Sequence, residues 1–256
     1  MTINLTNEMS AHKELRDAQD GHDLEPQPII HFPQQNIPPN KVAVELVSFS
    51  LVFGVCIGAC LCMAFRSESS SRVWMYYASW ASTLWAQLAI TAGWGAVELT
   101  TDSHAWTVYS VGILIGHIEF EISRYFFPAS KSYAYISYIG FVLLFLGQVL
   151  RSWAIIQASR NGSYPPTSLD KVEGHHLLTD GAYRYFRHPC DAGPFYWALG
   201  MQLLLQNPIS FSVFLIVMWR FLYPKFQAEE DTLIEVYGDE YRNYRKRVGT
   251  KIPFIP

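Results

Sequence analysis

The residues with the clearest chemical potential form a basic triplet, Arg187-His188-Pro189, on a polar loop between apolar segments. Two acidic residues, Glu229 and Glu230, follow after two further apolar segments. If those segments are membrane helices, ionisable groups so close to the bilayer are costly, and function is the usual reason for keeping them. An Arg guanidinium suits a carboxylate or a phosphate, which it binds through two parallel hydrogen bonds. The triplet and the acidic pair are therefore our first candidates for a functional site.

Each of these residues also has an ordinary structural interpretation. Arg187 could extend its charged end to lipid headgroups. His188 could be a general base, a hydrogen-bond donor to a cofactor, or a residue that shapes the turn before Pro189; a single His is most often structural. Glu229 and Glu230 could begin an amphipathic helix, where acids interact favourably with the N-terminal dipole. The functional alternative is that one of them faces a cationic ligand.

The composition indicates an integral membrane protein. The chain has 256 residues, of which 50% are hydrophobic and 16% charged, against about 25% charged in an average soluble domain. A net charge of -3 and the lack of a long Lys/Arg run argue against a nucleic-acid partner. The four cysteines form no CxxC pair and no Cys/His metal spacing, so we expect neither disulfides nor a metal site.

Six apolar segments are candidate transmembrane helices, since about 20 apolar residues cross a bilayer. They are residues 42–65, 74–97, 105–127, 133–158, 195–206 and 208–223. The last two would be only about 18 and 24 Å long as helices, so we expect a short C-terminal hairpin that dips into the membrane or barely crosses it. Both ends of such a hairpin emerge on the same side. The triplet loop would then lie beside Glu229 and Glu230.

We expect three regions along the chain. Residues 1–40 are polar and rich in proline, which predicts a disordered tail. Residues 41–158 hold four transmembrane helices. Residues 159–256 form a catalytic region with a cofactor-binding loop, the hairpin and an amphipathic helix over 227–248, which Gly249 ends. Lys and Arg residues in this region favour the cytosolic side. The fold class is thus an all-α membrane protein of about six transmembrane helices with a cytosolic cofactor-binding loop region.

Two glycine pairs have GxxxG spacing, Gly54/Gly58 and Gly112/Gly116. Such pairs permit close approach of helices, including helices of two copies in a homodimer, although matches are common by chance. Nearby, His117, Glu119 and Glu121 are interpreted as helix-capping residues near an interface, and an intramembrane site is the less favoured alternative.

The polar motifs together resemble those of the isoprenylcysteine carboxyl methyltransferases (protein-S-isoprenylcysteine O-methyltransferases). The motifs are His175-His176-Leu177-Leu178, Gly181-Ala182-Tyr183, Arg187-His188-Pro189, Gly193, Asn207-Pro208, Glu229-Glu230, Tyr237-Gly238-Asp239-Glu240-Tyr241 and the ending Pro253-Phe254-Ile255. The resemblance covers residues 159–256 in order and spacing, and the upstream helices agree in number and character. Arg-His-Pro alone is less specific, because related membrane methyltransferases and sterol reductases carry similar loops.

The resemblance implies methylation of the α-carboxylate of a C-terminal prenylated cysteine by S-adenosylmethionine. It implies a multi-pass protein of the endoplasmic reticulum membrane, with its catalytic side in the cytosol. The partners implied are membrane lipid and CaaX-processed proteins, namely small GTPases or lipopeptide pheromones. The implied cofactor-binding residues are His175, His176, Leu177, Leu178, Tyr183, His188, Pro189, Cys190, Asp191 and Glu230. Arg187 and Glu230 are the implied catalytic residues, and Lys225 and Arg187 the implied substrate-binding residues.

This chemistry needs few protein groups. A sulfonium is an activated methyl donor and a carboxylate is already a nucleophile, so the enzyme mainly supplies proximity and orientation. Arg187 or Lys225 would hold the carboxylate, and Glu230 would offset the sulfonium charge. A cleft between membrane helices would take the prenyl chain. The alternatives are an NADPH-dependent membrane reductase, a phospholipid N-methyltransferase and a non-catalytic relative.

Several positions depart from the family pattern and indicate a divergent, fungal-like member. Cys190-Asp191 stands where relatives usually have Ser-Tyr, and Pro194 replaces a typically aromatic residue. Ser168 falls near a position where relatives place an amide side chain, and residues 161–171 lack the Phe/His-rich pattern. The acid at Asp191 changes the electrostatics beside the triplet.

Overall fold

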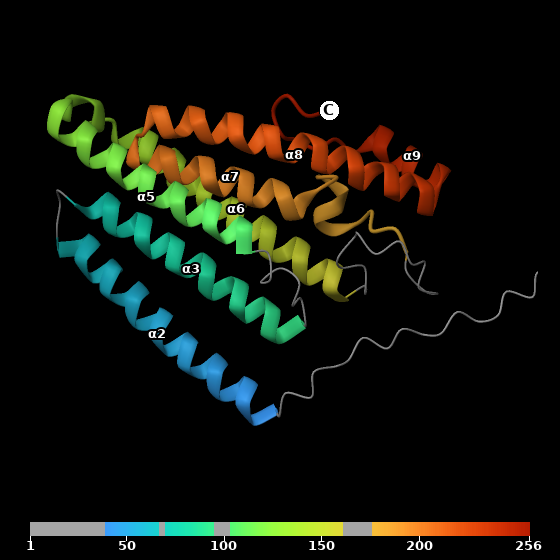
Figure 1. Cartoon of the computed structure of the whole chain (residues 1–256), viewed down its shortest axis with the longest axis horizontal. Coiled ribbons are helices and arrows are strands. Elements are labelled where there is room, and N and C mark those ends of the chain that lie inside the picture. Colours follow the sequence, from blue (N-terminus) through green and yellow to red (C-terminus); the bar gives the residue numbers. More distant parts are fainter. Residues whose placement is uncertain (1–38, 67–69, 95–102, 161–175) are drawn as a thin grey trace, which may run out of the picture. The chain divides into compact units, whose positions relative to one another are not determined.

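In the part of the chain that the computed structural model describes, residues 39–66, 70–94, 103–160 and 176–256, the fold is all-helical (Figure 1). The helices are α2 (Pro39–Arg66), α3 (Ser71–Trp94), α5 (Ser103–Phe126), α6 (Ala134–Arg160), α7 (Pro189–Leu205), α8 (Pro208–Tyr237) and α9 (Asp239–Arg247), with short 3-10 turns η1 (Pro128–Lys131) and η2 (Gly181–Arg184). The predicted tail lies outside the described residues except for its end, which begins α2.

The length of the helices and their exposed apolar side chains are typical of a membrane protein. Three segments are long and apolar enough to cross a bilayer, Val47–Arg66, Ala134–Arg160 and Pro208–Tyr237. Large apolar side chains remain exposed on them, including Val55, Phe145 and Ile216, as expected of faces that lie against lipid rather than water. The predicted all-α membrane class is confirmed. That α3, α5 and α7 also cross the bilayer stays a prediction.

The predicted hairpin boundaries are wrong in two ways. The first arm, α7, begins at Pro189 rather than at residue 195, and the second, α8, continues past residue 223 to Tyr237. With 30 residues, α8 is about 45 Å long, so this arm is not short. Hydropathy falls after residue 223, but Phe226 and Glu230 remain buried against the protein and the helix continues.

The predicted amphipathic helix over 227–248 is likewise two elements. Its first part is the end of α8, and α9 follows as a separate helix. The break is at Gly238, whose φ of 57° and ψ of −125° glycine adopts far more readily than residues with a Cβ atom. The helix α8 therefore ends at Gly238, within the predicted range, whereas α9 ends at Arg247, close to the predicted stop at Gly249.

The backbones of α6 and α7 are in close contact at positions occupied by glycine. Gly140 and Gly147 of α6 face Gly200 and Gly193 of α7, each pair being one heptad apart. A Cβ atom on Gly147 would lie 2.6 Å from the carbonyl oxygen of Gly193, and one on Gly193 would lie 2.7 Å from that of Gly147. The pairing is antiparallel and leaves no room for a side chain, so it fixes the start of α7 against α6.

The GxxxG pairs of the sequence do not form this contact. A Cβ atom on Gly54 or Gly58 would meet nothing within 4 Å, whereas one on Gly112 would clash with the ring of Phe214. A Cβ atom on Gly116 would likewise lie 2.8 Å from Gln202 Oε1 and from Tyr76 Oη, so the pair Gly112/Gly116 does permit close packing against neighbouring helices. The glycines that join α6 to α7 are instead spaced by seven, a signal that a search for GxxxG passes over.

At the opposite end of the hairpin, two charged residues bind the turn between α7 and α8. Lys131 Nζ donates to the carbonyl oxygens of Leu205 and Gln206 at 3.1 and 2.7 Å. The carboxylate of Glu119 accepts from the backbone amides of Ile209 and Ser210 at 2.9 and 2.6 Å. These bonds satisfy backbone groups that helix ends leave unpaired. Glu119 therefore does act as a cap, but for α8 instead of its own helix.

We predict that Gly193→Ala destabilises the protein by about 1–3 kcal/mol, because the added methyl group must push apart two packed backbones. The thermal unfolding midpoint in detergent measures the effect. Gly54→Ala is the matched control, since its methyl group meets open space and alanine has the higher helix propensity. Equal midpoints for the two variants would show that the α6–α7 glycine seam (Gly140, Gly147, Gly193 and Gly200) does not stabilise the protein.

Candidate functional site

The side-chain amide of Gln157, on α6, forms hydrogen bonds to the loop before α7. Gln157 Nε2 donates to the carbonyl oxygen of Asp180 at 3.0 Å, and Gln157 Oε1 accepts from the backbone N–H of Ala182 at 3.1 Å. Gly181 lies between them with φ +54°, and a Cβ atom there would lie 2.4 Å from Gln157 Oε1. The positive φ therefore favours glycine, and a larger residue would also displace the Gln157 side chain that holds the loop.

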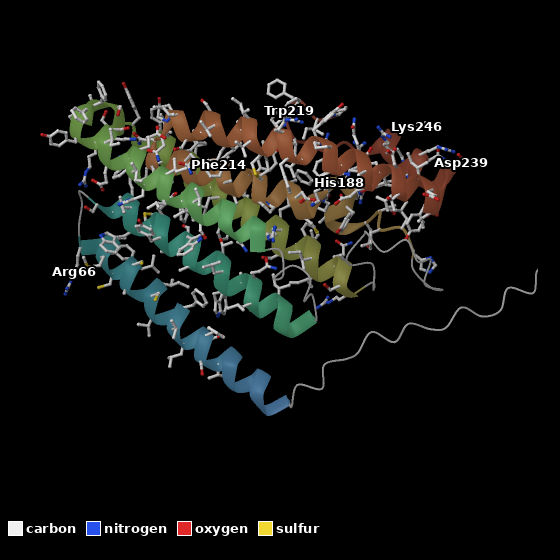
Figure 2. The ribbon with its side chains drawn as sticks, viewed as in Figure 1. Arg66, His188, Phe214, Trp219, Asp239 and Lys246 are labelled. Carbon is white, nitrogen blue, oxygen red and sulfur yellow. The ribbon has the colours of Figure 1, made fainter. Side chains whose placement is uncertain are left out.

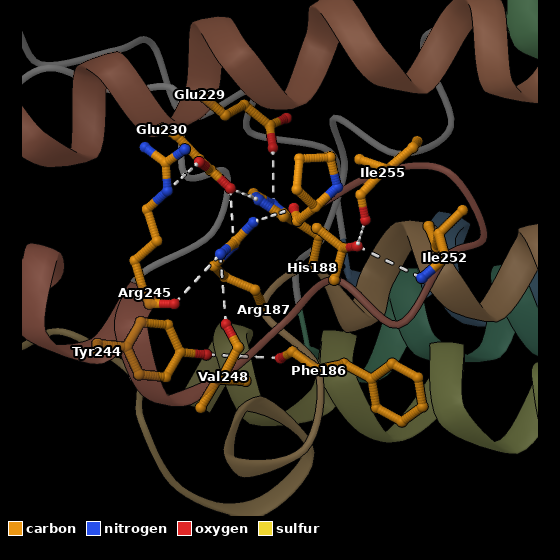
Figure 3. Close-up of polar contacts among 12 residues, drawn as sticks. Phe186, Arg187, His188, Glu229, Glu230, Tyr244, Arg245, Val248, Ile252 and Ile255 are labelled. Carbon is orange, nitrogen blue, oxygen red and sulfur yellow. Dashed lines mark hydrogen bonds and ion pairs between the residues drawn. The ribbon is translucent and has the colours of Figure 1, made fainter.

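Arg187 is buried, with 7% of its surface exposed. Its Nε lies 2.7 Å from Glu230 Oε1 as an ion pair without hydrogen-bond alignment. Nη1 donates to the carbonyl oxygen of Val248 at 3.3 Å, and Nη2 to that of Pro256 at 2.5 Å. The backbone N–H donates to the Gly249 carbonyl at 3.1 Å. The guanidinium thus joins three segments of the protein, and the interpretation that it extends to lipid headgroups is wrong (Figure 3).

Glu230 lies among three basic side chains and is itself 5% exposed. Its Oε1 is 2.7 Å from Arg187 Nε and 3.2 Å from His188 Nε2, and its Oε2 is 3.1 Å from Arg245 Nε. Glu229 and Glu230 lie well inside α8, so the explanation through a helix N-terminal dipole is wrong. The predicted proximity of the triplet to the acidic pair is confirmed.

His188 is held between the two acids. Its Nδ1 lies 3.2 Å from Glu229 Oε2 and its Nε2 3.2 Å from Glu230 Oε1, while its ring stacks on Phe226 at 4.1 Å between centroids. Burial disfavours the charged ring, but the hydrogen bonds to Glu229 and Glu230 and the charges of Glu229 and Asp191 outweigh burial and raise the pKa of His188. Two carboxylate partners favour an imidazolium, which has no lone pair for a general base.

Lys225 and Asp191 form the more accessible edge of this cluster. Lys225 Nζ lies 2.6 Å from Asp191 Oδ1 and 3.5 Å from Glu229 Oε1. The side chains of Lys225 and Asp191 are 37% and 21% exposed, against 5% and 7% for Arg187 and Glu230. Asp191 belongs to the first turn of α7, so this ion pair connects the two arms of the hairpin. Lys225 is therefore paired within the chain.

The remaining predicted cofactor-binding residues lie on the loop and at the start of α7. Leu178 and Pro189 are buried, Leu177 and Tyr183 are half-buried, and His176 is exposed. Tyr183 Oη lies 3.4 Å from Cys190 Sγ. His175, Ser168 and the linker 161–171 lie outside the described residues. A cofactor-binding role for this set stays a prediction.

Three residues of the site were not identified from the sequence. Arg245 binds Glu230, Phe226 stacks on His188, and Tyr244 donates to the carbonyl oxygen of Tyr183 at 2.6 Å. Tyr244 is buried, and burial raises the pKa of its phenol, so it remains a neutral donor. Phe226 and Glu230 are four residues apart and share a helix face, a spacing from which Phe226 could have been found.

Comparison with known proteins identifies the family. The model of the isoprenylcysteine carboxyl methyltransferase (ICMT) family matches residues 138–235. The protein-S-isoprenylcysteine O-methyltransferase of Rattus norvegicus is 32% identical over 221 residues, which cover 85% of this chain and 76% of the rat protein. The chain belongs to the isoprenylcysteine carboxyl methyltransferase family.

Other members of the family extend the comparison. The Tribolium castaneum protein-S-isoprenylcysteine O-methyltransferase is 37% identical over 161 residues, 62% of this chain and 57% of that protein. A solved structure of the eukaryotic intramembrane Ras methyltransferase ICMT covers 85% of this chain and 98% of its own, with a TM-score of 0.59 and 24% identity, and shows a shared fold.

The resemblance drawn from the motifs is confirmed, and similarity extends upstream of residue 159. As a divergent member of the isoprenylcysteine carboxyl methyltransferase family, the chain is a multi-pass membrane enzyme. Membership favours this interpretation over the reductase and phospholipid methyltransferase alternatives.

We predict that His188 makes the stability of the protein depend on pH. Because its pKa is higher in the folded state than the ordinary 6.5, its contribution is complete below about pH 6.5 and is lost as pH rises through the raised folded value. The thermal unfolding midpoint in detergent should therefore fall over this range in the wild type, and His188→Asn should remove this part of the fall.

The exposed His176 gives the control for this measurement. His176→Asn should leave the pH dependence as in the wild type. If His188→Asn and the wild type follow parallel curves above pH 6.5, His188 is not held as an imidazolium.

Proposed function

We propose that this enzyme transfers a methyl group from S-adenosylmethionine to the α-carboxylate of a C-terminal prenylcysteine, forming a methyl ester. The observation that supports this proposal is a cluster of basic and acidic side chains at the start of α7 and within α8 of a membrane enzyme of this family. Its basic members are Arg187, His188, Lys225 and Arg245, and its acidic members are Asp191, Glu229 and Glu230.

Such a cluster fits both proposed ligands. The carboxylates suit the positive charges of S-adenosylmethionine, which supplies an activated methyl group when bound. The accessible ammonium of Lys225 suits the carboxylate of the prenylcysteine. The carboxylate is already a nucleophile, so methyl transfer needs alignment rather than proton removal. This agrees with an imidazolium at His188.

The surroundings of Arg187 and Glu230 favour a positioning role within this reaction. Both side chains are buried and have protein partners, and together they hold His188 and Pro189 at the start of α7. We propose that the cofactor lies against this start, where Tyr183, Cys190 and Asp191 come together, and against the loop that carries His175, His176, Leu177 and Leu178. Lys225 is the proposed ligand of the substrate carboxylate.

We further propose prenylated proteins as substrates, including small GTPases and lipopeptide pheromones, with the prenyl chain between membrane helices. The basic end of α9, with Arg245, Lys246 and Arg247, favours a cytosolic catalytic side on the endoplasmic reticulum membrane. A homodimer remains part of the proposal, although the α6–α7 glycine seam lies within one chain.

We predict that membranes containing the wild-type protein transfer labelled methyl to N-acetyl-farnesylcysteine as a base-labile ester. Arg187→Ala and Glu230→Ala should each lose most of this activity, because removing one partner of a buried ion pair leaves an uncompensated charge and costs about 3–5 kcal/mol. Arg242→Ala is the control, since Arg242 forms an exposed pair with Asp239 that is worth about 0.2–1 kcal/mol.

The outcomes separate the alternatives. Wild-type activity in both buried variants would refute the site assignment. A wild type that binds NADPH instead of S-adenosylmethionine would indicate a reductase, and methylation of a phospholipid headgroup would indicate an N-methyltransferase. A folded protein that binds no S-adenosylmethionine would be a non-catalytic relative.

A further inference from the structure

We propose that Asp191 is an internal competitor for Lys225: its carboxylate occupies the ammonium in the ligand-free enzyme and is displaced by the carboxylate of the substrate. Asp191 would then determine how tightly the prenylcysteine is bound. This inference rests on the proposed function, because it takes Lys225 as the ligand of the substrate carboxylate.

The ion pair lies where a ligand can reach it. Lys225 and Asp191 are 37% and 21% exposed, and they are joined at 2.6 Å. The pair at the centre of the cluster, Arg187 with Glu230, is 5% and 7% exposed and is closed off by the C-terminal segment (Figure 3). Exchange of one carboxylate for another is therefore expected at Lys225 rather than at Arg187.

Asp191 and the substrate present the same chemical group to the same cation. Glu229 is already 3.5 Å from Lys225 Nζ, so a substrate carboxylate at full contact would be the third anion around one ammonium. Like charges so close repel one another. Because Glu229 is also held by His188, Asp191 is the anion that must yield.

The position of Asp191 allows it to leave at low cost. It lies in the first turn of α7, where the helix N-terminus stabilises an acid. Its side chain is also partly exposed to solvent. A carboxylate released from Lys225 therefore keeps a favourable environment, unlike Glu230, which is enclosed by protein.

A double-mutant cycle tests the proposal. The four proteins are the wild type, Asp191→Asn, Lys225→Gln and the double variant, and the measurements are KM for N-acetyl-farnesylcysteine and Kd for S-adenosylmethionine. Asp191→Asn should lower KM by about twofold to fivefold, the range expected when one partly exposed competing charge is removed. Because Asp191 also lies at the proposed cofactor site, Kd is measured for each protein and KM is determined at saturating S-adenosylmethionine. Lys225→Gln should raise KM, and in its background Asp191→Asn should have no further effect.

Asp239→Asn is the matched control, because it removes an acid from a surface pair with Arg242 and should leave KM at the wild-type value. A KM that rises or stays constant in Asp191→Asn overturns the proposal, as does a decrease that persists without Lys225. If Asp191→Asn and Asp239→Asn lower KM equally, the effect is a general one of net charge, and the proposal is likewise overturned.

Folding of the variants is checked by their thermal unfolding midpoints in detergent, and Asp191→Ser provides a second substitution. If both Asp191 variants fail to fold, the residue is structural and the proposal is wrong. Failure of the proposed function looks different, since the wild type itself would then form no ester. Ester formation by the wild type with an unaltered KM in the Asp191 variants refutes only the competition.

Discussion

A buried guanidinium meets a buried carboxylate where the loop before α7 crosses α8. This contact between Arg187 and Glu230 links segments far apart in the sequence, and the same guanidinium holds the carbonyl oxygens of Val248 and Pro256. A buried charge is tolerated only with partners. Because Arg187 needs partners, its contacts hold the loop, α8 and the C-terminal segment together. They also place His188 between Glu229 and Glu230.

The position of that contact depends on how the hairpin is held along its whole length. The glycine seam fixes the depth of α7 against α6, because backbone contact permits no sliding. At the far turn, Lys131 and Glu119 bind the end of α7 and the beginning of α8. His188 lies toward the α9 end of the helices, where Asp239 and Lys246 also lie (Figure 2). The packing of α7 and α8 against the other helices thus determines where Arg187 and Glu230 meet.

The charges of the site are nearly balanced before any ligand arrives. Glu229 and Glu230 favour the protonated form of His188, which is unsuited to act as a general base, and Asp191 partly neutralises Lys225. For a reaction between a sulfonium and a carboxylate this is an advantage, since the two reactants bring opposite charges and need a fixed geometry rather than a base. The central pairs are enclosed, and the exchangeable pair lies at the edge.

The sequence by itself determined the all-helical membrane class and the motifs that resemble the family, because hydropathy and motif spacing are local properties. It also indicated that the triplet would meet Glu229 and Glu230, since a hairpin returns its ends to one side. Only the tertiary structure decided that Arg187 is enclosed, that Lys225 is paired with Asp191, and that Arg245, Phe226 and Tyr244 complete the site. Burial and the choice of ionic partner depend on residues that are distant along the chain, so no local pattern contains them.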